Sequence, residues 1–188
     1  NASGSVSSSN VTNIGVSCTT NTYTVGGAVS GLSGSGLVLS LNAGAQTLTV
    51  AANGAFTFPT ALASGSNYTV TVQTQPSGPA QSCSVTNGNG TVGASNVTNV
   101  TVTCATNTYT VGGSVTGLAG SGLVLSLNAG AQTLPVAANG TFTFPTALAS
   151  GSSYAVTVQT QPASPTQTCA VSNGSGTVVA TSITNIAV

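Results

Sequence analysis

Charged side chains are absent from this 188-residue chain, which contains no Lys, Arg, Asp, Glu or His. General acid–base catalysis needs a group that exchanges protons near the working pH, and a Ser or Thr nucleophile needs an adjacent base. Metal sites rely on carboxylates, His or clustered thiolates, and nucleic-acid phosphates are neutralised by Lys and Arg. We therefore expect no enzyme, no catalytic, cofactor-binding or metal site, no cofactor and no nucleic-acid partner.

Long apolar runs are absent as well, since none approaches the roughly 18 residues of a membrane-spanning helix. The chain is nevertheless 40% hydrophobic, with a mean hydropathy of +0.38. Disordered chains combine low hydrophobicity with high net charge, and this chain has neither property. Its many Val and Thr residues, separated by Gly, Asn and Ser, predict a folded all-β protein without a membrane span.

The sequence repeats itself with a period of 86 residues, because residues 19–102 match residues 105–188 at 63 of 84 positions without a gap. Residues 1–18 resemble the end of the same unit. We therefore predict two repeats, 19–104 and 105–188, preceded by residues 1–18 as the last strand of an earlier repeat or as a donor strand. Both ends interrupt the repeat, so we expect the array to continue on either side.

Within one repeat, short strand signals alternate with turn residues, and no helical period is present. Tyr68, Val70 and Val72 share one face of their strand. Pro135 replaces Thr49, and because Pro cannot donate to a ladder, we expect an edge strand there. Seven strands per repeat predict a two-sheet sandwich. They are expected near residues 22–31, 36–42, 46–51, 54–58, 67–75, 82–86 and 96–104.

A longer pattern lies in "NGAFTFPTALASGSNYTVTV" and its copy "NGTFTFPTALASGSSYAVTV". It resembles the prealbumin-like and collagen-adhesin B-type repeats of bacterial surface proteins, within the immunoglobulin-like group. The resemblance implies Greek-key sandwiches in an extracellular, secreted or surface-attached stalk or filament. It also implies tyrosine-corner roles for Tyr68 and Tyr154. Such repeats often carry a Lys–Asn isopeptide bond, which this chain cannot form without Lys, so we expect another crosslink.

The four cysteines offer that crosslink. Cys83 and Cys104 lie on the last two predicted strands of one repeat and are predicted to face inward. A disulfide between them would be worth about 3 kcal/mol in the chain-entropy model and implies an oxidising compartment. The alternative is two buried free thiols. Cys18 and Cys169 have no partner in this scheme, so we expect each to bond to a neighbouring repeat or to a neighbouring subunit.

These expectations combine into a functional prediction. Only four residues separate Cys104 from Tyr109, which favours a stiff connection between the two repeats. We expect a rigid, charge-free structural module of an extracellular fibre or adhesin stalk, associating with itself or with further repeats. One alternative is a carbohydrate- or cell-surface-binding module that uses the rings of Tyr23 or Tyr109. Another is ice binding by the Thr row of "NVTNVTVT".

Overall fold

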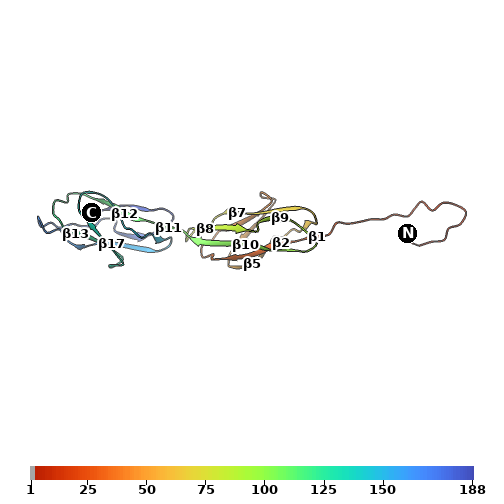
Figure 1. The fold of residues 1–188 in the computed structure, drawn as a ribbon, viewed down its shortest axis with the longest axis horizontal. Helices are drawn as coiled ribbons and strands as arrows, with labels where there is room; N and C mark the ends of the chain where they lie inside the picture. Colours follow the sequence, from red (N-terminus) through yellow and green to blue (C-terminus); the bar gives the residue numbers. More distant parts are fainter. Residues whose placement is uncertain (1–2) are drawn as a thin grey trace.

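The computed structural model describes residues 3–188, and these residues form strands, turns and loops without a helix. Two β-sandwiches lie end to end, and an extended segment precedes them (Figure 1). We call residues 22–106 the first sandwich, residues 108–188 the second sandwich and residues 3–20 the arm. The predicted all-β fold is confirmed.

The first sandwich has two four-stranded sheets with the orders β4-β3-β7-β9 and β5-β2-β10-β8, and β1 and β6 form a separate pair. Most of its strands coincide with the predicted ones within one or two residues. The short strands β6 and β9 were not expected. The strands are β1 (Thr22–Tyr23), β2 (Val25–Ser30), β3 (Leu37–Leu41), β4 (Gln46–Val50), β5 (Gly54–Thr57), β6 (Leu62–Ala63), β7 (Asn67–Thr74), β8 (Gln81–Thr86), β9 (Asn89–Thr91) and β10 (Val97–Thr106).

Strand β10, at the end of the repeat, lies in the middle of its sheet between β2 and β8. It runs parallel to β2, with Val102 opposite Val29, and antiparallel to β8, with Cys104 opposite Cys83. The close approach of β2 and β10 explains a glycine inside a strand, because a Cβ on Gly27 would overlap the carbonyl oxygen of Val100. Strands β2 and β10, from the beginning and the end of the repeat, are thus direct neighbours.

The core of the first sandwich follows from the alternation of apolar residues. On β10, Val100, Val102 and Cys104 are buried, and on β7 the same holds for Tyr68 and Val70. Buried side chains of both sheets form one cluster, in which two phenylalanine rings meet edge to face with centroids 6.0 Å apart. The cluster comprises Val25, Val29, Leu32, Leu37, Leu39, Leu41, Val50, Phe56, Phe58, Tyr68, Val70, Cys83, Val92, Val100, Val102 and Cys104.

The second sandwich repeats this plan around its own core, but one of its sheets has three strands, ordered β15-β12-β19. The other sheet is β14-β13-β17-β18, so β14, which contains Pro135, lies at an edge as predicted. The strands are β11 (Thr108–Tyr109), β12 (Val111–Val115), β13 (Leu123–Leu127), β14 (Gln132–Val136), β15 (Gly140–Thr143), β16 (Leu148–Ala149), β17 (Ser153–Thr160), β18 (Ser175–Thr177) and β19 (Ile183–Ala187).

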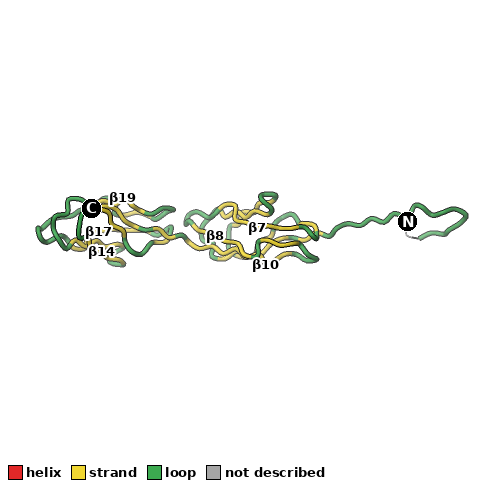
Figure 2. The backbone as a smooth tube through the Cα atoms, turned by 45° about the horizontal axis from the view of Figure 1, so that its top comes forward, coloured by secondary structure: helices red, strands yellow, loops and turns green. Residues whose placement is uncertain are grey.

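The junction between the repeats and the N-terminal segment differ from what the sequence predicted. Strand β10 continues to Thr106 and β11 begins at Thr108, so the junction lies at Asn107 instead of after residue 104. Residues 3–20, which include most of the predicted last strand or donor strand 1–18, are exposed and form no strand, and Figure 2 shows their backbone as a loop. Residues 1 and 2 of that segment lie outside the described residues.

Candidate functional site

The junction between the sandwiches is a single residue held from both sides. The N–H of Asn107 donates to the carbonyl of Ala80 in the first sandwich at 3.0 Å. The carbonyl of Asn107 accepts from the N–H of Ser150 in the second sandwich at 2.8 Å. Its side-chain oxygen accepts from the hydroxyl of Ser82 at 2.8 Å. Asn107 therefore fixes the path of the chain from β10 into β11.

Ser150 supplies a direct contact between the sandwiches. Its hydroxyl oxygen accepts from the N–H of Ala80 at 2.9 Å, and its hydroxyl donates to the carbonyl of Val179. Ser150 is 6% exposed, whereas its equivalent in the first sandwich, Ser64, is exposed. The two serines occupy matching turns, so the difference in burial comes from the first sandwich covering Ser150.

A small apolar contact completes this junction. A Cβ on Gly151 would lie 3.5 Å from the Cβ of Pro79, which is ordinary van der Waals distance. The loop at residues 78–80 of the first sandwich thus rests against the turn at residues 150–151 of the second. We call Pro79, Ala80, Asn107, Ser150 and Gly151 the joint.

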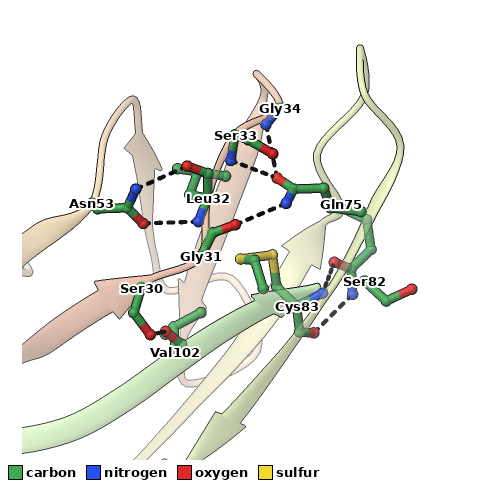
Figure 3. The surroundings of a disulfide bond; sticks show 12 residues. Ser30, Gly31, Leu32, Ser33, Gly34, Asn53, Gln75, Ser82, Cys83 and Val102 are labelled. Atoms are coloured by element: carbon green, nitrogen blue, oxygen red, sulfur yellow. Dashed lines mark hydrogen bonds between the residues drawn. A yellow bond between two sulfur atoms is a disulfide. The ribbon is translucent and has the colours of Figure 1, made fainter. Parts of the chain in front are cut away.

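The predicted disulfide between Cys83 and Cys104 is present and joins directly opposed residues of β8 and β10 (Figure 3). Their Cα atoms are 3.9 Å apart, the short spacing of a non-hydrogen-bonded antiparallel pair. The N–H of Cys83 accordingly donates to Oε1 of Gln75 at 2.7 Å, and its carbonyl accepts from Nε2 of the same side chain at 3.0 Å. The Gln75 side chain therefore occupies the outer edge of β8.

The buried amide of Gln81 connects the disulfide region to the loop after β2. Its Oε1 accepts from the N–H groups of Ser33 and Gly34 at 2.8 and 2.7 Å. Its Nε2 donates to the carbonyl of Gly31 at 2.8 Å and to the hydroxyl of Thr106 at 3.3 Å. Gln81 is only 2% exposed, and these bonds fill its hydrogen-bonding capacity. It therefore fixes this end of the first sandwich.

Cys18 and Cys169 are free thiols in this chain and lie on different parts of it. Cys18 is on the exposed arm, while Cys169 is half-buried beside the second core. The structure brings Cys83 and Cys104 together and keeps these two apart. Their predicted bonds to neighbouring repeats or subunits stay a prediction.

The two predicted tyrosine-corner residues are packed inside the sandwiches. Tyr68 and Tyr154 are buried, and each ring lies over a glycine of the opposite strand, Gly90 and Gly176 respectively. No hydrogen bond of their hydroxyls appears among the described residues, so the tyrosine-corner assignment stays a prediction.

The rings proposed as a carbohydrate platform have a similar environment. Tyr23 is half-buried against the first core and Tyr109 against the second. Each ring therefore contributes to packing, and the two occupy equivalent positions in the two sandwiches. Carbohydrate binding by these rings stays a prediction.

Sequence reasoning missed the joint and the buried glutamine. Ala80 and Ser150 are 70 residues apart, so no local pattern connects them. One usable signal was the asparagine in a very short linker, because Asn often bonds to nearby backbone. A second was the glutamine two positions before a buried cysteine, on the strand face that points inward.

Together, the fold and these contacts define an all-β protein of two sandwiches that are joined through one residue. A disulfide crosslinks two strands within the first sandwich. Scans of the chain against protein-family models and against curated proteins find no match. Within residues 3–188, no helix is long and apolar enough to cross a membrane. The same residues contain no group of three or more side chains suited to hold a metal ion.

Proposed function

We propose that this chain is a rigid structural module of an extracellular fibre or surface-adhesin stalk. The joint is the observation that carries the proposal. Flexible linkers between domains are exposed and make few contacts, whereas Asn107 bonds to both sandwiches and Ser150 is buried between them. A fixed joint transmits orientation from one sandwich to the next, which is what a spacer or fibre element requires.

The disulfide supports the extracellular part of the proposal. Structural disulfides persist in oxidising compartments and are rare in the cytosol. Here the disulfide connects the two strands that lead into the joint, β8 and β10. The crosslink therefore stabilises the end of the sandwich that holds the next one.

The absence of charged side chains supports a role in a durable extracellular fibre. Without Asp, Glu, His, Lys or Arg, the fold has no side-chain ion pairs for salt to screen and no sites for trypsin-like proteases. Sheet edges without Lys also lack a common protection against edge-to-edge pairing. Lateral association, a hazard for a soluble monomer, suits a fibre component.

Measuring the relative orientation of the sandwiches tests the proposal. In weak alignment, amide residual dipolar couplings of both sandwiches should fit one common alignment tensor. Scattering should give a rod of about 70 Å for the two sandwiches, since the longest strand has ten residues and a strand extends about 3.4 Å per residue. Two independent tensors for the unmodified chain would contradict a rigid module.

Variants of the joint sharpen this test. Ser150→Ala removes the acceptor for Ala80, and a flexible six-residue Gly/Ser insertion after Thr106 separates the sandwiches. With the insertion, the two sandwiches should need two independent tensors. With Ser150→Ala, the couplings of both sandwiches should fit one common tensor less well than in the unmodified chain but better than with the insertion. Ser64→Ala is the matched control, because the equivalent serine contacts no second sandwich, and it should leave the common tensor unchanged.

A further inference from the structure

Strand β4, at the edge of one sheet of the first sandwich, has backbone groups that face away from the sheet. The N–H of Asn42, directly after β3, donates to the carbonyl of Thr69 on β7 at 2.8 Å. Bonding direction alternates along a strand, so the odd-numbered residues of β3 bond to β4, and one of them is the partner of Leu48. The neighbours of Leu48, Thr47 and Thr49, therefore direct their N–H and C=O groups outward, where no strand pairs with β4 among the described residues.

The second sandwich has a protected edge at the equivalent place. Pro135 takes the position of Thr49, and β14 pairs with β13 in the same register as β4 with β3. Pro has no N–H, and at an outward position its ring removes no bond from the ladder. Pro135 thus takes one outward donor away from this edge, which is a common protection against pairing between molecules. Strand β4 keeps that donor.

The other edge strands of the first sandwich are short or covered. Strand β9 has only three residues, and the Gln75 side chain covers the outer edge of β8 at Cys83. Strand β5 has four residues, and Pro59 follows two residues after its end. Strand β4 has five residues, and it contains neither Pro nor Lys. Within residues 22–106, β4 is therefore the edge most open to another strand.

Strand β4 is held in position at both ends. At its start, Oε1 of Gln46 accepts from the N–H of Thr60, and Nε2 donates to the carbonyl of Thr60, both at 2.9 Å. Just beyond its end, the side-chain amide of Asn53 bonds to the N–H and the carbonyl of Leu32, both at 2.8 Å. A strand fixed in this way loses little conformational entropy when it pairs, so the edge is preorganised for binding.

Strand β4 is also complementary to itself. When two β4 strands lie antiparallel about a two-fold axis at Leu48, each Thr47 stands opposite the Thr49 of the other strand. The two pairs exchange four N–H···O=C bonds, and their side chains meet on the outer face of the sheet. On the inner face, the two Leu48 side chains, each half-buried at the border of its core, lie side by side. No charged residue is present to repel the second copy.

We propose that β4 of the first sandwich pairs antiparallel with β4 of a second copy of this chain, so that two sheets continue as one. The pairing names the contact behind the lateral association of the proposed function, and it rests on that function for its role. It is an isologous contact made by strand addition. Because the strands run along the long axis of the molecule, the two copies lie side by side in opposite directions (Figure 1).

Sedimentation velocity at increasing concentration tests the pairing. All samples carry Cys18→Ser and Cys169→Ser, so that no disulfide between copies contributes, and this double variant is the parent chain. The parent should pass from one copy to two as its concentration rises. Thr49→Pro should weaken dimerisation about tenfold or more, because each dimer loses two of its four strand-to-strand bonds. A parent that stays a single copy at about 1 mM would overturn the inference.

Two matched variants separate the backbone contact from other effects. Pro135 shows that this fold accepts proline at the position. Thr49→Val keeps the N–H and the branched shape, so it should dimerise within about threefold of the parent. Pro135→Thr gives each chain a second open edge and should produce assemblies of more than two copies. Equal dimerisation of Thr49→Pro and Thr49→Val, or a Pro135→Thr chain that stops at two copies, would contradict the pairing.

Hydrogen exchange locates the contact. The amides of Thr47 and Thr49 should gain protection as the dimer forms, whereas the amide of Thr133, the equivalent of Thr47 in the second sandwich, should not. A dimer without added protection at Thr47 and Thr49 would refute the inference. A common alignment tensor together with no dimer would refute this inference alone. Two independent tensors together with a β4 dimer would instead refute the rigid module and leave the pairing in place.

Discussion

Breaking the disulfide between Cys83 and Cys104 should destabilise the first sandwich selectively. The two cysteines are separated by 21 positions, and closing a loop of that size restricts the unfolded chain by about 3 kcal/mol in the chain-entropy model. That is a large share of the roughly 5–15 kcal/mol that stabilises a typical domain. The same loss is expected from reduction of the native chain and from the double variant Cys83→Ala/Cys104→Ala.

Urea unfolding followed by tyrosine fluorescence and circular dichroism measures this change. Each sandwich contains two tyrosines, so both report. With a urea dependence of about 1.5 kcal/mol per molar for a small domain, the midpoint of the first sandwich should fall by about 2 M. The native chain before and after reduction gives the comparison without any change in packing volume.

The second sandwich provides an internal control, because its Cys169 is a free thiol. Its transition should stay where it is when the disulfide is reduced. A shift of the first transition by less than about 1 kcal/mol would refute the loop-entropy reasoning. Equal shifts of both transitions would instead show that the two sandwiches unfold as one unit.

Three further predictions concern the interior and the solvent. Gly27→Ala should lower the free energy of unfolding of the first sandwich in urea by about 3 kcal/mol or more, because the added Cβ overlaps the Val100 carbonyl. Gly93→Ala is the control, because its Cβ meets open space, and it should change that free energy by no more than about 0.5 kcal/mol. Gln81→Leu should lower the free energy of unfolding of the first sandwich by about 2–4 kcal/mol, because the N–H groups of Ser33 and Gly34 lose their acceptor. Gln167→Leu should lower that of the second sandwich by less, because Gln167 is more exposed. The free energy of unfolding should stay constant within about 0.5 kcal/mol from about pH 4.5 to pH 7, since no side chain titrates there; a sloping profile would contradict this reasoning.

Strand positions and the disulfide were predictable because both depend on local patterns. Alternation in "NYTVTVQ" places Tyr68 and Val70 on the buried face whatever the partner strand is. The same alternation on β10 turned Cys104 inward. Two cysteines that face inward on neighbouring strands of one sheet, β8 and β10, can reach each other and form a disulfide.

The rest depends on contacts between distant parts of the chain. The parallel pairing of β2 with β10 joins residues more than 70 positions apart, and nothing local in either strand specifies it. The glycine at position 27 hinted at a close backbone approach without naming the neighbour. Strands β6 and β9 are two and three residues long, too short for a period to show.

The parallel arrangement of β2 and β10 has a mechanical consequence. Tension along the rod would enter the first sandwich through the short strand β1 and then β2, and it would leave through the end of β10, which leads into the second sandwich. Pulled from opposite ends, two parallel neighbours load all of their ladder hydrogen bonds together instead of one after another. Stretching the first sandwich therefore shears the hydrogen bonds between β2 and β10 at the same time. Single-molecule pulling should show a higher rupture force than for a sandwich of similar stability whose strands separate one by one.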